Sequence, residues 1–158
     1  MEKLDIKIAQ NVYDMIISTL KSQDYKFLQP DNLKVAFQFE TDGTPIVFSV
    51  VIDAERQLIR MIAGYSITFP KERRIDGAIA TCSTNCNLVA GGFDFDYETG
   101  SVVFRISASF AGSIISPDVF LYMVHKAYSA CALYDKKLDL LAKGELSLAE
   151  YLYLFEDD

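Results

Sequence analysis

Two cysteines, Cys82 and Cys86, stand four residues apart in a segment with helical periodicity, which places both thiols on one face of a helix. Two thiolates on one face could bind a metal ion or form a redox pair. A zinc site needs two more ligands, and the remaining candidates, Cys131 and His125, are far away in sequence. We therefore expect Cys82 and Cys86 to be buried as small apolar residues.

His125 is the only histidine, and so the only side chain whose ordinary pKa suits a general base near neutral pH. No nucleophile elbow or comparable motif lies near it. We expect His125 to pack on the flank of a long helix.

Three acidic residues, Asp94, Asp96 and Glu98, alternate along the chain as they do at the start of a calcium-binding loop. The rest of that motif is missing, because its glycine would fall on Thr99 and its bidentate acid on Arg105. The pattern instead predicts the polar face of a strand that leads into a tight turn.

A basic cluster, Lys71, Arg73 and Arg74, stands at the start of a predicted helix. It could contact one phosphate. Positive charge at this helix end opposes the helix dipole, which points to an acidic group nearby, but we expect a solvated helix start instead. The sequence contains no GxGxxG, Walker or HExxH motif. We therefore predict a protein that is not an enzyme, with no catalytic residue, no cofactor and no metal.

The composition indicates one globular domain spanning residues 1–158. Apolar residues make up 51% of the chain, and 15 basic against 22 acidic side chains give a net charge of −7. A domain of this size can bury its own core, and the acidic balance argues against binding to nucleic acid or anionic membranes. The start of the chain lacks a secretory signal, no apolar run is long enough for a membrane span, and the three cysteines suit a reducing cytoplasm.

The periodicity predicts how these residues are positioned. An amphipathic helix is followed by a three-stranded meander with a possible bulge at Gly64, a second helix, a hairpin, a long helix that starts at Ser116, and a short last helix. The second helix should bury the stripe Ile75, Ala78, Ile79, Cys82, Cys86 and Val89. The predicted elements are residues 5–23, 33–40, 46–53, 58–69, 71–87, 93–97, 102–110, 116–143 and 147–155, with a turn at 41–45.

Three segments resemble the YbjN family: Ile52-Asp53-Ala54-Glu55-Arg56, the helix end Asn85-Cys86-Asn87-Leu88, and the hairpin from Gly92 to Arg105. That family is described as bacterial sensory-transduction regulators and is similar in fold to type III secretion chaperones. The resemblance implies a protein that dimerises and binds an extended client segment, with no catalytic residues to transfer. The pair Cys82 and Cys86 and the tail after Gly144 depart from the family pattern.

The predicted fold is α+β, a five-stranded antiparallel sheet with helices mainly on one face, in the order α-β-β-β-α-β-β-α(-α). The other face would carry apolar side chains that solvent alone would cover poorly, so we expect a second copy or a protein partner there. These dimer or partner candidates are Ala36, Val47, Val51 and Val103.

The leading hypothesis is therefore a homodimeric, non-catalytic, protein-binding regulator or chaperone-like domain. Two alternatives stay open. One is a small-molecule sensor with a pocket between the long helix and the sheet, lined by Phe104, Tyr128 and Tyr134; the other is a thiol enzyme built on Cys82 and Cys86.

Overall fold

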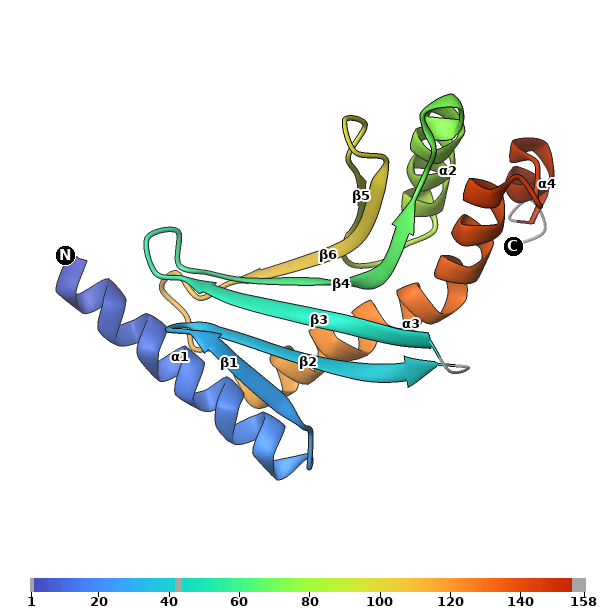
Figure 1. Cartoon of the computed structure of the whole chain (residues 1–158). Helices are drawn as coiled ribbons and strands as arrows, with labels where there is room; N and C mark the ends of the chain where they lie inside the picture. Colours follow the sequence, from blue (N-terminus) through green and yellow to red (C-terminus); the bar gives the residue numbers. More distant parts are fainter. Residues whose placement is uncertain (1, 42–43, 155–158) are drawn as a thin grey trace.

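The computed structural model describes residues 2–41 and 44–154, which form a sheet with four α-helices around it (Figure 1). The elements follow the chain as α1 (Glu2–Ser22), β1 (Phe27–Asp31), β2 (Lys34–Thr41), β3 (Thr44–Asp53), β4 (Leu58–Thr68), η1 (Lys71–Arg73), α2 (Arg74–Cys86), β5 (Gly92–Phe95), β6 (Ser101–Ser109), α3 (Pro117–Lys143) and α4 (Leu148–Tyr153).

The sheet is antiparallel and has six strands in the order β1-β2-β3-β4-β6-β5, so the prediction of five strands is wrong by one. The additional strand, β1, contains Pro30 and pairs irregularly with β2, with a register shift between Leu28 and Asp31. A short segment with a proline reads as a turn in the sequence, although proline is tolerated on an edge strand. The bulge predicted at Gly64 is confirmed by a register shift between Ala63 and Ile67; the turn predicted at 41–45 includes Asp42 and Gly43, which lie outside the described residues.

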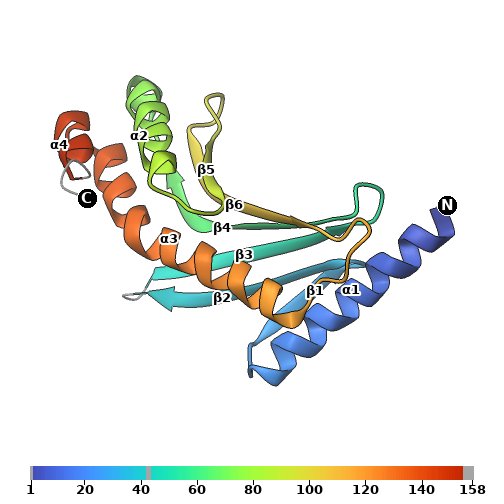
Figure 2. The same cartoon turned by 180° about the vertical axis from the view of Figure 1, so that it is seen from behind.

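The core lies on one face of this sheet. α1 and α3 lie on the same side, with α3 crossing the sheet diagonally (Figures 1 and 2). Alternate residues of β2 and β3 point toward these helices because successive side chains of a strand face opposite sides. Phe37 and Phe48 stack with their ring centroids 4.8 Å apart, and Phe39 meets Phe48 edge to face.

Local capping sets the ends of the long helix as predicted. The Ser116 hydroxyl accepts a hydrogen bond from the Val119 N–H, and Pro117 follows at the first helical position. At the other end Gly144 adopts the left-handed conformation, with φ 78°. A capping box between Ser147 and Glu150 starts α4; the last residue predicted for this helix, Phe155, lies outside the described part of the chain.

The second helix is rotated relative to the prediction. Its buried residues are small or polar: Gly77, Ala80, Thr81 and Thr84. Gly77 allows close packing, since a Cβ there would lie 2.5 Å from the Phe95 ring and 2.9 Å from the Phe69 ring. The largest apolar residues therefore point outward, and a stripe assigned by hydrophobicity alone falls on the wrong side of the helix.

Within residues 2–41 and 44–154, no helix combines the length and the apolar character that crossing a membrane requires.

Candidate protein-binding surfaces

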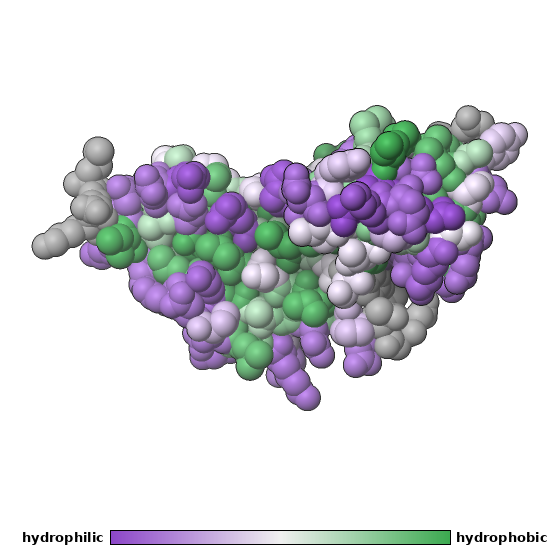
Figure 3. All heavy atoms as spheres, turned by 45° about the horizontal axis from the view of Figure 1, so that its top comes forward, coloured by the Kyte–Doolittle hydropathy of each residue, from purple (hydrophilic) through white to green (hydrophobic). Residues whose placement is uncertain are grey.

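The four predicted partner residues share the face of the sheet opposite the helices. Val47 is 49% exposed, and Ala36, Val51 and Val103 are partly exposed. Figure 3 shows apolar surface over the middle of the molecule with polar side chains along its borders. We call Ala36, Val47, Val51 and Val103, together with the exposed Ile62, the outer sheet patch.

Strand register explains why these side chains form one patch. Ala36 and Ile62 flank Ser49 on neighbouring strands, and Val47 lies opposite Gly64. On the β6 side of Gly64, the Val103 Cα lies 3.7 Å from the position that a Cβ on this glycine would take, an ordinary van der Waals distance. Ile62 is a patch residue that the sequence reasoning did not assign, although its alternation with Met61 and Ala63 along the predicted strand was the available signal.

The outward side of α2 forms a second exposed apolar surface. Ile75, Ile79 and Val89 are all exposed, and so are the thiols of Cys82 and Cys86. Ile75, Ile79, Cys82 and Cys86 recur at helical spacing along α2, and Val89 follows in the loop after the helix ends at Cys86. We call these five residues the α2 stripe. Large apolar side chains aligned on one exposed helix face are typical of a protein contact.

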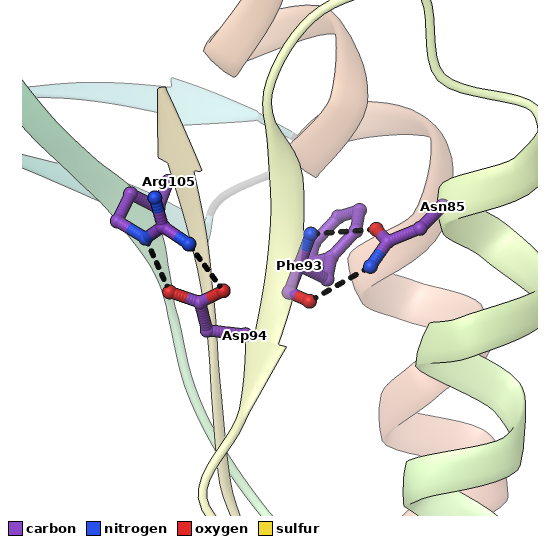
Figure 4. A network of polar contacts seen from close by, with 4 residues as sticks. All are labelled: Asn85, Phe93, Asp94 and Arg105. Atoms are coloured by element: carbon purple, nitrogen blue, oxygen red, sulfur yellow. Dashed lines mark hydrogen bonds and ion pairs between the residues drawn. The ribbon is translucent and has the colours of Figure 1, made fainter. Parts of the chain in front are cut away.

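The outer edge of β5 is closed by a side chain. The Asn85 amide at the end of α2 accepts a hydrogen bond from the Phe93 N–H at 2.7 Å and donates one to the Phe93 carbonyl at 3.0 Å (Figure 4). This amide provides the donor and acceptor that a neighbouring strand would provide. β5 therefore has no free pairing site at Phe93.

An ion pair joins β5 to β6 on the opposite side of the sheet from Asn85's helix. The Arg105 guanidinium donates two hydrogen bonds to the Asp94 carboxylate, one of them 3.0 Å long. Both side chains are about half exposed. Donation of this hydrogen bond to the Asp94 carboxylate is also the main cause that raises the pKa of Arg105.

A groove lies beside β6, next to the residue at which β5 begins. Pairing between these strands stops at Gly92 and Arg105, while β6 continues to Ser109. The groove has a volume of about 590 Å³ and runs between this part of β6 and the first turns of α3. Its lining includes Gly91, Gly92, Ile106, Ser107, Val119 and Tyr122.

The structure does not assemble the predicted thiols into a chemical site. Cys82 and Cys86 are exposed rather than buried, so that expectation is wrong, and the Cys86 thiol lies 3.6 Å from the Cys82 carbonyl in its own helix. In the described residues no group of three or more His, Cys, Asp or Glu side chains is placed to hold a metal. Cys131 is buried in the core, where desolvation followed by the neighbouring Asp135 raises the pKa of its thiol and disfavours the reactive thiolate.

The other polar candidates have structural partners. Asp96 closes the β5–β6 turn, where the Thr99 hydroxyl is the main cause that lowers the pKa of this carboxyl. The Arg74 guanidinium donates hydrogen bonds to the carbonyls of residues 97–99, so it binds this turn instead of lying free in solvent. His125 is exposed on α3 and lines a small hollow of about 220 Å³ with Tyr128.

The aromatic residues proposed as a sensor pocket mostly belong to the core. Phe104 and Tyr134 are buried and both pack edge to face against Phe93, with centroid distances of 5.3 and 6.0 Å. Tyr128 instead packs against Phe39. The three rings therefore do not line one common pocket.

No protein-family model and no curated protein matches this sequence. Solved structures do match in fold. A chain of the HopA1–SchA chaperone–effector complex is 12% identical with a TM-score of 0.54, covering 80% of this chain and 96% of that one.

Two further structures give similar values. YbjN from E. coli, provisionally called a transcription regulator, is 12% identical with a TM-score of 0.57, covering 84% of this chain and 91% of that one. A chain of the ExsC–ExsE complex is 12% identical with a TM-score of 0.54, covering 82% and 95%. The chain therefore has the fold shared by YbjN and the type III secretion chaperones, as the sequence resemblance implied.

Proposed function

We propose that this chain is a non-catalytic protein-binding domain that acts as a homodimer and holds an extended segment of a client or partner protein. The observation that carries the proposal is the outer sheet patch, an apolar surface on the face of the sheet that the helices leave uncovered. The fold is shared with a chain of the HopA1–SchA chaperone–effector complex and with a chain of the ExsC–ExsE complex, and this likeness supports the same role. The same binding role suits a regulator as well as a chaperone.

The surface chemistry also favours a protein ligand and a reducing compartment. A net charge of −7 gives no general attraction to nucleic acid or to anionic lipid. The exposed thiols of Cys82 and Cys86 would be open to oxidation outside such a compartment, so we place the protein in the cytoplasm.

The test is the mass in solution, measured by light scattering over a wide concentration range for the parent and for Val47→Glu and Val51→Glu. A charge placed in an interface of two apolar patches loses its hydration, so both variants should dissociate a dimer. The control Ala132→Glu adds the same charge at an exposed position of α3 outside the patch, and it should remain dimeric.

Ile79→Glu, measured in parallel, assigns the interface. A dimer that only Ile79→Glu dissociates would place the two-fold contact on the α2 stripe and leave the outer sheet patch for the client. A parent that is monomeric at every concentration would overturn the homodimer.

A further inference from the structure

We propose that the small hollow beside His125 binds a quaternary ammonium compound from solution, with a trimethylammonium head like that of choline. The hollow has a volume of about 220 Å³ and lies between α3 and the end of β2. Its lining includes three aromatic and two polar residues: Tyr25, Phe39, Tyr128, Glu40 and His125. This inference adds a small-molecule site to the proposed protein-binding function and does not depend on it.

Three segments that are distant in sequence bring the aromatic rings together. Tyr25 lies in the connection between α1 and β1, Phe39 on β2 and Tyr128 on α3. Phe27 at the start of β1 pairs with Phe37 of β2, so the chain just before β1 places Tyr25 beside Phe39. The hollow therefore exists only in the folded chain, which is why sequence patterns did not reveal it.

The rings stand nearly at right angles to one another. The rings of Tyr25 and Tyr128 are each inclined by 83° to the Phe39 ring, with centroid distances of 5.0 and 5.8 Å. Phe39 is itself fixed by edge-to-face contacts with the core rings of Phe37 and Phe48. Aromatic walls that meet in this way enclose a ligand from more than one direction, as in the aromatic cages that bind methylated ammonium groups.

The three rings are accessible, unlike the other aromatic cluster next to α3. Tyr25, Phe39 and Tyr128 are partly buried and border the hollow. Phe93 and Phe104, by contrast, are 3% and 0% exposed and belong to the core. A cation that enters the hollow loses water against partly buried rings, where attraction to the ring faces is stronger than at a fully exposed ring.

The chemistry of the lining selects a quaternary ammonium group. An aromatic face attracts positive charge but offers no hydrogen-bond acceptor to replace the water around a primary ammonium ion. A quaternary ammonium ion spreads its charge over methyl groups, which pack against the rings as apolar surface does. The residues Glu40 and His125 at the border suit the hydroxyl end of a small cation such as choline.

Charge and size agree with this ligand. The net charge of −7 raises the concentration of small cations near the protein surface. Pockets that enclose drug-sized ligands measure roughly 300–1,000 Å³. At about 220 Å³ the hollow suits a single head group instead.

The test is a titration of the protein with choline chloride, followed by NMR. Ring currents should shift the methyl protons of bound choline upfield, and the amide signals of His125 and Tyr128 should move in a saturable manner. The matched ligand control is the neutral isostere of choline, in which carbon replaces the ammonium nitrogen, because it has the same shape without the charge. We expect choline to bind about tenfold more tightly than the isostere.

Two variants, Tyr25→Leu and Tyr128→Leu, each remove one ring and keep an apolar side chain. Each should weaken choline binding about fivefold or more, whereas Tyr128→Phe keeps the ring and should bind choline like the parent. Tyr122→Leu is the matched control, since Tyr122 lines a different groove and its ring lies below the Lys126 ammonium, 5.4 Å from the centroid. It should retain choline binding. The comparison of choline with its isostere in the parent needs no variant, so the proposal stays testable if a ring variant does not fold.

The outcomes decide both the site and the source of the ligand. Equal affinities for choline and the isostere, parent-like binding in both leucine variants, or no saturable shift at high millimolar choline would overturn the proposal. A trimethyllysine peptide presents the same head group on a protein, and tenfold tighter binding of that peptide than of choline would overturn the assignment to a free compound. Charge-dependent binding that falls in Tyr25→Leu and Tyr128→Leu and survives in Tyr122→Leu supports it.

Discussion

At the scale of single residues, Asn85 has the clearest structural role near the groove. Its side chain binds both backbone groups of Phe93 and so joins α2 to β5, although it lies at an exposed helix end. The Thr84 hydroxyl, one residue earlier, lies 2.6 Å from the Tyr151 hydroxyl of α4. Consecutive residues of α2 therefore fix two elements that are distant in sequence.

We predict that Asn85→Ala lowers the free energy of unfolding by about 1–3 kcal/mol, because two hydrogen bonds are lost and two backbone groups lose their partner. Urea denaturation followed by circular dichroism measures this change. Asn11→Ala, at an exposed position inside α1, is the matched control for the higher helix propensity of alanine and should not destabilise the protein. Equal stability of the two variants would contradict the bridging role of Asn85.

The sequence predicted the helix caps more accurately than it predicted the long-range side-chain hydrogen bonds. The serine, proline and acid at 116–118 act through local hydrogen bonding and backbone geometry, so the start of α3 follows from neighbouring residues alone. The contacts of Asn85 and Arg74 reach residues 8 and 23 to 25 positions away. No periodicity encodes such contacts, which is why the sequence did not reveal them.

At the scale of elements, the tight turn between β5 and β6 sets the hairpin that borders the groove. Gly100 occupies it with φ 79°, and its carbonyl accepts a hydrogen bond from the Phe69 N–H at 2.8 Å. A Cβ on Gly100 would collide with the Phe69 carbonyl oxygen. The glycine is therefore required both by its backbone angles and by the close approach of Phe69, the residue that follows β4.

We predict that Gly100→Ala destabilises the protein by about 3 kcal/mol or more, from left-handed strain together with a backbone collision. Gly112→Ala separates the two causes, since Gly112 has a similar φ of 64° but no atom within 4 Å of the added Cβ. This control should cost only about 1 kcal/mol. Thermal unfolding of both variants measures the difference, and equal melting temperatures would contradict the role assigned to the Phe69 carbonyl.

The elements themselves were largely predictable because each follows from hydrophobic periodicity and turn residues. The orientation of α2 was not, since packing there depends on small residues against the rings of Phe69 and Phe95 rather than on the most hydrophobic face. Likewise, β1 is a strand because β2 offers it an edge, which is a tertiary cause. The candidate patch of Ala36, Val47, Val51 and Val103 followed from strand alternation, whereas the groove depends on where β5 stops relative to β6.

At the scale of the whole molecule, the helices gather on one face of the sheet and leave the outer sheet patch on the other face. A separate groove of about 590 Å³ lies between β6 and the first turns of α3.

The acidic character of the molecule predicts how its stability responds to pH. Four carboxyl groups, three of them exposed and that of Asp53 partly buried, have lowered pKa values, and each is held by a nearby donor. The main donors are the Lys34 side chain for Asp31, the Arg56 N–H for Asp53, the Thr99 hydroxyl for Asp96 and the Ser147 hydroxyl for Glu150.

A carboxyl group with a lower pKa in the folded state binds fewer protons there than in the unfolded chain. The contribution of such a group to the free energy of unfolding is therefore complete above the unfolded pKa of about 4 and is lost as the pH falls through the folded pKa.

We expect the urea midpoint to fall steadily between about pH 5 and about pH 2. In Asp96→Asn this dependence should be shallower, and in Thr99→Val, which keeps the carboxyl but removes its main donor, it should be shallower as well. A parent whose midpoint stays constant over that range, or variants with the parent's slope, would show that these turn and cap hydrogen bonds do not distinguish the folded from the unfolded chain.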